Sequence, residues 1–125
     1  MKKLFTIIAL AVAIFTANTA FASTAENETN YSDTASTTER VSAYSTDEYV
    51  VFFKAGMEVC VLVEGDGDTD LDLYVYDENG NLVDKDIDEL DICVCSWTPK
   101  WSGKFTIKVK NLGSVYNQYT ISVVQ

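Results

Sequence analysis

The fold is decided by one stretch near the middle of the chain, Asp70-Leu71-Asp72-Leu73-Tyr74-Val75-Tyr76. Apolar and polar residues alternate along it, and side chains two positions apart lie on the same face of a β-strand. We therefore expect Leu71, Leu73 and Val75 to face a core, with the aspartates and tyrosines between them facing water. One buried face and one solvated face are typical of an antiparallel sheet.

The residues that follow this strand predict a tight hairpin. Asn79-Gly80 is the preferred pair for a two-residue type I′ turn, because both central residues of that turn need a positive φ. Leu82-Val83 would then begin the return strand. The same strand signals recur between turn residues in the ranges 48–53, 57–63, 92–97 and 104–111, and around Tyr119, Ile121 and Val123.

These signals predict an all-β domain with about seven or eight short strands at intervals of about ten residues. No helical pattern competes with them after the N-terminal segment, so the expected fold class is an antiparallel β-sandwich. We expect the domain to cover residues 46–125. Residues 23–45, rich in serine, threonine, asparagine and glutamate, are expected to be a flexible polar lead-in that could include one early strand at 41–44.

The first 22 residues have the three-part pattern of a secretory signal peptide. Met1-Lys2-Lys3 is a short cationic start, an apolar run extends from Leu4 to Phe15, and Ala20 and Ala22 supply small residues at the cleavage-determining positions. Cleavage after Ala22 predicts a secreted or periplasmic protein. The apolar run is shorter than the roughly 20 residues that span a bilayer, so we expect no membrane insertion.

The charge balance excludes several classes of function. The chain carries 19 acidic and 9 basic residues, a formal net charge of −10, and it has no histidine. Without imidazole there is no Ser–His or Cys–His nucleophile pair and no histidine-ligated metal. The negative charge repels phosphate backbones, so nucleic acid is not expected as a partner. We expect a monomer, with an acidic surface suited to a hard cation bound through oxygen atoms.

The stretch Gly65-Asp66-Gly67-Asp68-Thr69-Asp70-Leu71-Asp72-Leu73-Tyr74-Val75-Tyr76-Asp77 resembles the bacterial pre-peptidase C-terminal domain family, as do Trp97-Thr98-Pro99 and Gly103-Lys104-Phe105-Thr106-Ile107-Lys108-Val109. The resemblance covers about residues 46–125 and extends to the similar collagen-binding domains of clostridial collagenases. It implies a jelly-roll-like sandwich, usually appended to secreted peptidases, some members of which bind calcium. The predicted signal peptide leads almost directly into the domain, so we expect a free-standing module.

The aspartates of this stretch are the candidate metal ligands. Carboxylates at alternate positions of an extended strand lie about 6.5–7 Å apart, and like charges that close repel one another unless a cation neutralises them. Calcium accepts 6–8 oxygen ligands in loose geometry. We therefore expect calcium to be bound by Asp66, Asp68, Asp70 and Asp72, with Asp86 from the second acidic run. The alternative is a solvated acidic face that keeps the protein soluble.

Calcium binding of the EF-hand type is disfavoured. Leu71 occupies the position of the turn glycine that an EF-hand loop requires, and no helices flank the stretch.

Aromatic residues are the candidate ligand-binding groups. Tyr74 and Tyr76 are predicted on the wet face of their strand, and Trp101 lies in a turn-rich segment. Such rings could stack on a sugar or contact a protein. The alternative is that they fill the core or cover its ends.

The three cysteines leave two alternatives open. Cys60 could form a disulfide with either Cys93 or Cys95 after export to an oxidising compartment, which would leave one thiol unpaired. Alternatively, all three are small buried residues with free thiols.

Catalysis is not expected, because no pair of carboxylates stands out and a sandwich of about 80 residues offers little cleft. The sequence predicts a secreted bacterial adhesion module, stabilised by calcium, that binds an extracellular protein or polysaccharide. The alternative is a passive secreted or envelope structural domain with no specific ligand.

Overall fold

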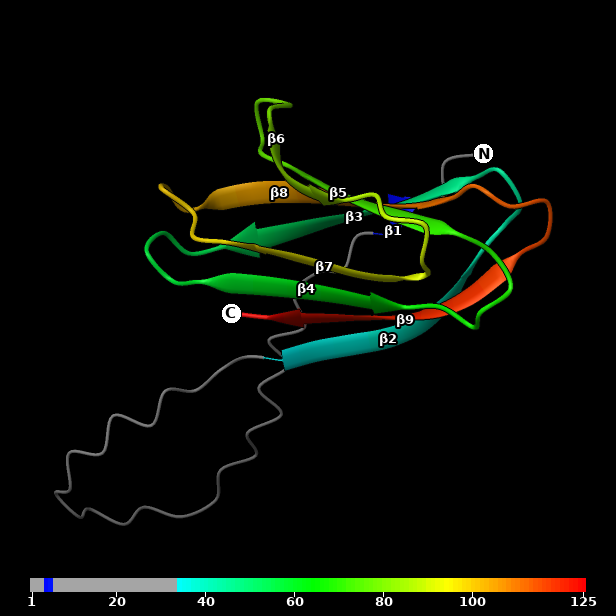
Figure 1. The fold of residues 1–125 in the computed structure, drawn as a ribbon. Coiled ribbons are helices and arrows are strands. Elements are labelled where there is room, and N and C mark those ends of the chain that lie inside the picture. The colour runs from blue at the N-terminus through cyan, green and yellow to red at the C-terminus, as the bar shows by residue number, and fades with distance from the viewer. Residues whose placement is uncertain (1–3, 6–33) are drawn as a thin grey trace, which may run out of the picture.

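The computed structural model describes residues 4–5 and 34–125, which form two β-sheets packed face to face (Figure 1). Residues 1–3 and 6–33, which include most of the predicted signal peptide and its cleavage position, lie outside the described residues. The strands are β1 (Leu4–Phe5), β2 (Thr34–Val41), β3 (Thr46–Phe53), β4 (Val59–Glu64), β5 (Leu71–Tyr76), β6 (Leu82–Asp86), β7 (Ile92–Trp97), β8 (Gly103–Asn111) and β9 (Asn117–Val124).

One sheet has five strands in the order β1-β3-β8-β5-β6, and the other has four in the order β2-β9-β4-β7. The short β1 runs parallel to β3, and every other neighbouring pair is antiparallel. The predicted all-β antiparallel sandwich is confirmed. No helix in the described part of the chain is long and apolar enough to cross a membrane.

The core lies between the sheets and follows the alternation of the strands. Leu71, Leu73 and Val75 of β5 are completely buried, as are Ile107 and Val109 of β8, so the predicted inward faces are confirmed. Strands β3, β4, β5, β7, β8 and β9 contribute alternate residues to the core, so apolar side chains interdigitate across the space between the two layers.

Strand β2 lies inside the segment predicted to be a flexible lead-in. It pairs with β9 along its whole length, from Thr34 opposite Val124 to Val41 opposite Asn117. Only Val41 is fully buried, and the outward hydroxyl groups bond across the pair, as in the 3.0 Å contact between Thr38 and Thr120. A polar edge strand has little apolar alternation, which is why sequence periodicity did not indicate it.

The hairpin between β5 and β6 forms at the predicted place with a different turn. Only Gly80 has a positive φ, of 80°, so the predicted type I′ turn, which needs a positive φ at Asn79 as well, is wrong. Three residues separate Asp77 from Asn81, whose carbonyl accepts the Asp77 N–H at 2.9 Å. The buried Asp77 carboxylate accepts the N–H groups of Asn79 and Asn81, each at 2.9 Å, and these bonds lower its pKa.

Strand β4 begins two residues later than the sequence indicated. It starts at Val59 rather than at Met57, which is 44% exposed in the connection from β3.

Candidate functional site

The outer face of the five-stranded sheet carries the two tyrosines predicted to bind a ligand. The register of β5 and β8 places Tyr74 opposite Lys108 and Tyr76 opposite Thr106. The alternation that buries the leucines of β5 points both rings outward, where each is half-buried. Strand pairing therefore brings together groups that lie about thirty positions apart in the chain.

The two rings form a small platform. Tyr74 and Tyr76 stack with their centroids 6.4 Å apart and their planes 18° from parallel. The Lys108 ammonium lies 5.2 Å from the centroid of Tyr76 and 3.3 Å from a carboxylate oxygen of Glu48. Tyr76 thus contacts both a neighbouring ring and a cation, which restrict its orientation before any ligand arrives.

The Tyr74 hydroxyl fixes the other ring. It donates to Asp72 at 3.2 Å, and burial, followed by the nearby Asp72 charge, raises the pKa of Tyr74. Asp72 points to the outer face as predicted, yet it is only 6% exposed. The expectation that it faces water is therefore wrong, because neighbouring side chains cover its carboxylate.

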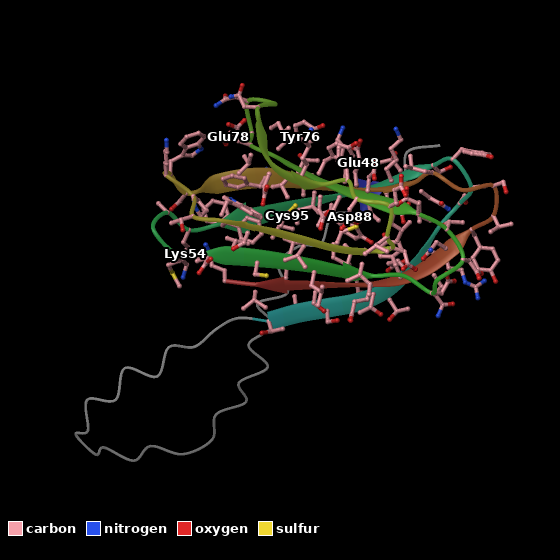
Figure 2. The ribbon with its side chains drawn as sticks, viewed as in Figure 1. Glu48, Lys54, Tyr76, Glu78, Asp88 and Cys95 are labelled. Carbon is pink, nitrogen blue, oxygen red and sulfur yellow. The ribbon has the colours of Figure 1, made fainter. Side chains whose placement is uncertain are left out.

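A groove with a volume of about 570 Å³ runs beside this platform. Its lining is mixed in charge and rich in hydrogen-bonding groups, from Glu48, Tyr76, Asp77, Glu78, Gly80, Lys104, Thr106 and Lys108. Figure 2 shows Glu48, Tyr76 and Glu78 along the same side of the molecule, above the five-stranded sheet.

The β5–β6 hairpin forms a wall of the groove. It rises from the sheet (Figure 1) and brings the Glu78 carboxylate against Gly103 at the start of β8. A Cβ at Gly103 would lie 3.2 Å from that carboxylate, which would then have to move by a few tenths of an ångström. Trp101 is 41% exposed in the β7–β8 connection and does not line the groove.

The five predicted metal ligands are distributed over three places. Asp66 and Asp68 lie in the β4–β5 connection, where the Asp66 carboxylate accepts the N–H groups of Asp68 at 3.1 Å and Gln118 at 2.9 Å. Asp72 bonds Tyr74 on the outer face, and Asp86 on β6 accepts the Val94 N–H at 2.9 Å. Among residues 4–5 and 34–125, no group of three or more acidic, cysteine or histidine side chains is arranged to hold a metal ion.

Asp70 differs from the other aspartates because its Oδ1 is buried and has no hydrogen-bond partner. Desolvation raises the pKa of its carboxyl, and repulsion from Asp72, Glu89, Asp88 and Asp91 raises it further. Repulsion of this kind is what a bound cation would relieve.

The cysteines lie on two different faces of the four-stranded sheet. Cys60 is opposite Ser96 and is partly exposed, whereas Cys95 is opposite Val61 and is buried together with Cys93. Side chains of directly paired residues share a face, so the Cys60 thiol points away from the other two. All three thiols are free, but Cys60 is partly exposed, so only Cys93 and Cys95 match the alternative of small buried residues with free thiols.

Sequence reasoning missed the groups that surround the tyrosines. Lys104 and Lys108 have an outward periodicity that the sequence shows, but nothing local indicates that β8 lies next to β5 rather than next to β7 or β9. Glu48 reaches the site from the other side of β8. Only the strand order could have identified these residues.

No family model matches the chain, and no curated protein sequence matches it either. Among solved structures, the pre-peptidase C-terminal domain of a collagenase from Bacillus anthracis superposes with a TM-score of 0.57 at 17% identity. The match covers 70% of this chain and 87% of that domain. The fold is similar to that of a pre-peptidase C-terminal domain. The resemblance indicated by the sequence is thus confirmed at the level of the fold.

The same fold is shared with two inhibitor structures. PliG from Aeromonas hydrophila, a periplasmic inhibitor of g-type lysozyme, has a TM-score of 0.58 at 16% identity, with 76% of this chain and 89% of that one covered. A mutant of the corresponding Escherichia coli inhibitor has a TM-score of 0.51 at 15% identity, with coverage of 77% and 91%. These neighbours are a collagenase domain and lysozyme inhibitors, and identities this low establish the fold alone.

Proposed function

We propose that the protein is an exported, non-catalytic binding module that holds a polysaccharide in the groove on the outer face of the five-stranded sheet. The observation that carries this proposal is the stacked pair of Tyr74 and Tyr76 beside Lys108. Sugar rings present apolar C–H faces that pack on aromatic rings, and their hydroxyl groups bond to polar side chains. The groove offers both kinds of contact within one concave surface.

Two of the three carboxylates that line the groove are already engaged by other groups, which favours binding over catalysis. Glu48 is ion-paired with Lys108, and Asp77 is occupied by the backbone of its own hairpin. The backbone N–H groups lower the pKa of Asp77, so its carboxyl is not a general acid at neutral pH. The absence of histidine from the whole chain removes the commonest general base.

A protein is the second candidate ligand, and export supports either candidate. Two of the structural neighbours are inhibitors of g-type lysozyme, both described as periplasmic, so the same fold binds a protein in those cases. The N-terminal pattern that predicts cleavage after Ala22 agrees with such a location.

Calcium belongs to the proposal as a stabilising ion. Its support is the unpartnered Oδ1 of Asp70, in a loop region crowded by other carboxylates. Asp68, Asp70 and Asp72 would supply oxygen ligands after a local rearrangement of side chains, since they do not converge on one point here.

The groove is tested with the variant Tyr74→Ala/Tyr76→Ala. The exported protein is assayed by co-sedimentation with insoluble polysaccharides (cellulose, chitin and peptidoglycan) and by calorimetry with a g-type lysozyme. Loss of two stacking rings should weaken binding of the recognised polysaccharide about tenfold or more, since each aromatic contact contributes about 0.5–1.5 kcal/mol.

The matched control is Thr120→Ala/Ser122→Ala, on the outer face of the four-stranded sheet, which should leave binding unchanged. Circular dichroism of both variants checks that they fold. The groove proposal is wrong if the tyrosine variant binds as well as the parent. Failure of every probe would support the passive structural alternative, and binding of lysozyme alone would favour the protein ligand.

A further inference from the structure

We propose that the loop end of the sandwich is a second interaction surface, which docks a protein through a positively charged patch on that partner. The loop end is defined by the connections 42–45, 65–70, 87–91 and 112–116, which gather at one end of the two sheets, on the right in Figure 1. It lies apart from the groove, and the inference goes beyond the function proposed for that groove.

Large apolar side chains are concentrated there. The described residues expose twelve such side chains, and six lie in these four short connections, namely Tyr44, Ile87, Leu90, Leu112, Val115 and Tyr116. Scattered single exposures need no explanation, but gathering at one end of a small domain marks an interaction site.

Tyr44 is presented in an unusual conformation. Its φ is +52°, in the left-handed region that residues with a Cβ rarely adopt, and its side chain is 73% exposed. The Tyr44 N–H donates to the Gly113 carbonyl at 3.1 Å, which ties it to the β8–β9 connection. An exposed ring on a strained backbone adds little to the stability of the fold, and backbone strain of this kind is concentrated at functional sites.

The loops that carry these side chains are fixed to one another. The buried Asn111 amide donates to the carbonyls of Ser42 and Val115, at 3.3 and 2.8 Å, and so joins the first and last connections. The Leu112 N–H donates to the Asp70 carbonyl at 3.0 Å, and the Gly65 N–H to the Asp91 carbonyl at 2.8 Å. A surface held in this way loses little conformational entropy on binding.

Tyr116 and Arg40 supply a second anchor at the loop end. The Arg40 guanidinium carbon lies 4.8 Å from the centroid of the Tyr116 ring. A shallow hollow of about 320 Å³ adjoins it, lined by Thr38, Glu39, Arg40 and Gln118. Tyrosine and arginine are among the residues that contribute most to protein–protein interfaces.

The charge of the loop end identifies the kind of partner. Its four connections contain six acidic residues and no lysine or arginine, the acidic ones being Asp66, Asp68, Asp70, Asp88, Glu89 and Asp91. A surface that combines exposed apolar and tyrosine side chains with these carboxylates is complementary to a basic protein surface, and it repels anionic polymers and anionic lipid surfaces. The groove differs, because lysines contribute to its lining.

The test is a titration of the isotope-labelled exported chain, followed by NMR. The probes are two basic proteins, a g-type lysozyme and cytochrome c, with acidic serum albumin as the control. We expect at least one basic probe to shift the amide signals of residues 42–45 and 112–116, with an affinity that falls about tenfold or more as the salt rises from 50 to 200 mM. Serum albumin should shift none of them.

The decisive variant is Tyr44→Gly/Tyr116→Ala. Neither change alters the charge, and glycine accepts the positive φ at position 44, so the loop conformation is kept. We expect binding of the basic probe to weaken about tenfold or more, while Tyr76→Ala in the groove leaves it unchanged.

Three results would overturn the inference. The first is that neither basic probe binds. The second is that the tyrosine variant binds as well as the parent, which would show non-specific charge attraction alone. The third is that a polysaccharide, rather than a basic protein, shifts the loop-end signals. Loss of groove binding in Tyr74→Ala/Tyr76→Ala affects none of these readings, so the groove and the loop end fail separately.

Discussion

The three cysteines occupy two chemical environments although they are close in the fold. Burial, together with the smaller effect of nearby aspartates, raises the pKa of the Cys93 and Cys95 thiols to about 12 each. The Cys93 thiol also donates to the Leu71 carbonyl at 3.0 Å. Cys60 is partly exposed on the opposite face. Their reactivity should therefore differ, because the thiolate is the reactive form.

We expect Ellman's reagent at pH 8 to modify only Cys60 in the folded protein. A thiol with a pKa of about 12 is ionised in only about one molecule in ten thousand at that pH. All three thiols should react after unfolding in guanidinium without a reductant. Fewer than three reactive thiols in the unfolded protein would reveal a disulfide and contradict the arrangement of the faces.

At the scale of the element, strand β7 is an edge of the four-stranded sheet and its outward backbone groups need protection. Two carboxylates from β6, at the edge of the other sheet, provide it. Asp84 accepts the Ser96 N–H and Asp86 accepts the Val94 N–H, both at 2.9 Å. The spacing of two residues on both strands aligns the two bonds. Asp86, which was predicted to bind metal, and its neighbour Asp84 therefore hold the two edges together.

Removing these two carboxylates should open the edge to pairing with a second molecule. We expect Asp84→Ala/Asp86→Ala to form dimers and larger species in sedimentation velocity, and to lose about 1–2 kcal/mol of unfolding free energy as two exposed, charge-assisted hydrogen bonds disappear. The control Asp88→Ala/Glu89→Ala removes the same charge and should remain in the state of the parent. If both variants self-associate to the same extent, the cause is the loss of net charge and not the exposure of the β7 edge.

At the scale of the whole molecule, the two sheets are joined by a buried polar chain as well as by apolar packing. Tyr119 of β9 donates to Asp47 of β3 at 2.8 Å, and its hydroxyl also bonds the hydroxyl of Tyr49. Burial raises the pKa of both tyrosines. Buried hydrogen bonds between layers specify one alignment of the sheets, which apolar contacts alone do less well.

Calcium is proposed to stabilise the whole two-sheet domain, and thermal unfolding tests this proposal. Calcium at 100 times its dissociation constant should add about 2.7 kcal/mol. That corresponds to roughly 10–20 °C in the midpoint for a domain of this size. Millimolar calcium should raise the midpoint above that in EDTA, whereas magnesium should not. An unchanged midpoint would leave the aspartates as a solvated acidic face.

Asp70→Asn is the matched variant for the calcium test. Without calcium it should stabilise the protein, although it removes a proposed calcium ligand. The pKa of Asp70 is raised in the folded state, so its contribution to stability falls as the pH rises through that range. At neutral pH the ionised carboxylate opposes folding, and Asp70→Asn should raise the midpoint in EDTA while abolishing the response to calcium. A calcium response that survives in Asp70→Asn would place the ion elsewhere.

The sequence by itself determined which segments are strands and which face of each is buried. Leu71, Leu73 and Val75 could be assigned to the core because the period of two is a property of the local backbone. The exceptions have local reasons, since β2 has too few apolar residues to show the period, and the hairpin turn depends on Asp77, which binds its backbone.

Only the tertiary structure decided what each polar side chain contacts. The place of Tyr76 beside Lys108, the attachment of Asp86 to Val94 and the position of Cys60 on the opposite face from Cys95 all follow from strand order and register. Those depend on pairings between distant segments, whose free energy comes from burial over the whole core. The sequence of an acidic run therefore shows where negative charge lies along the chain. Which groups those carboxylates contact is decided by the fold.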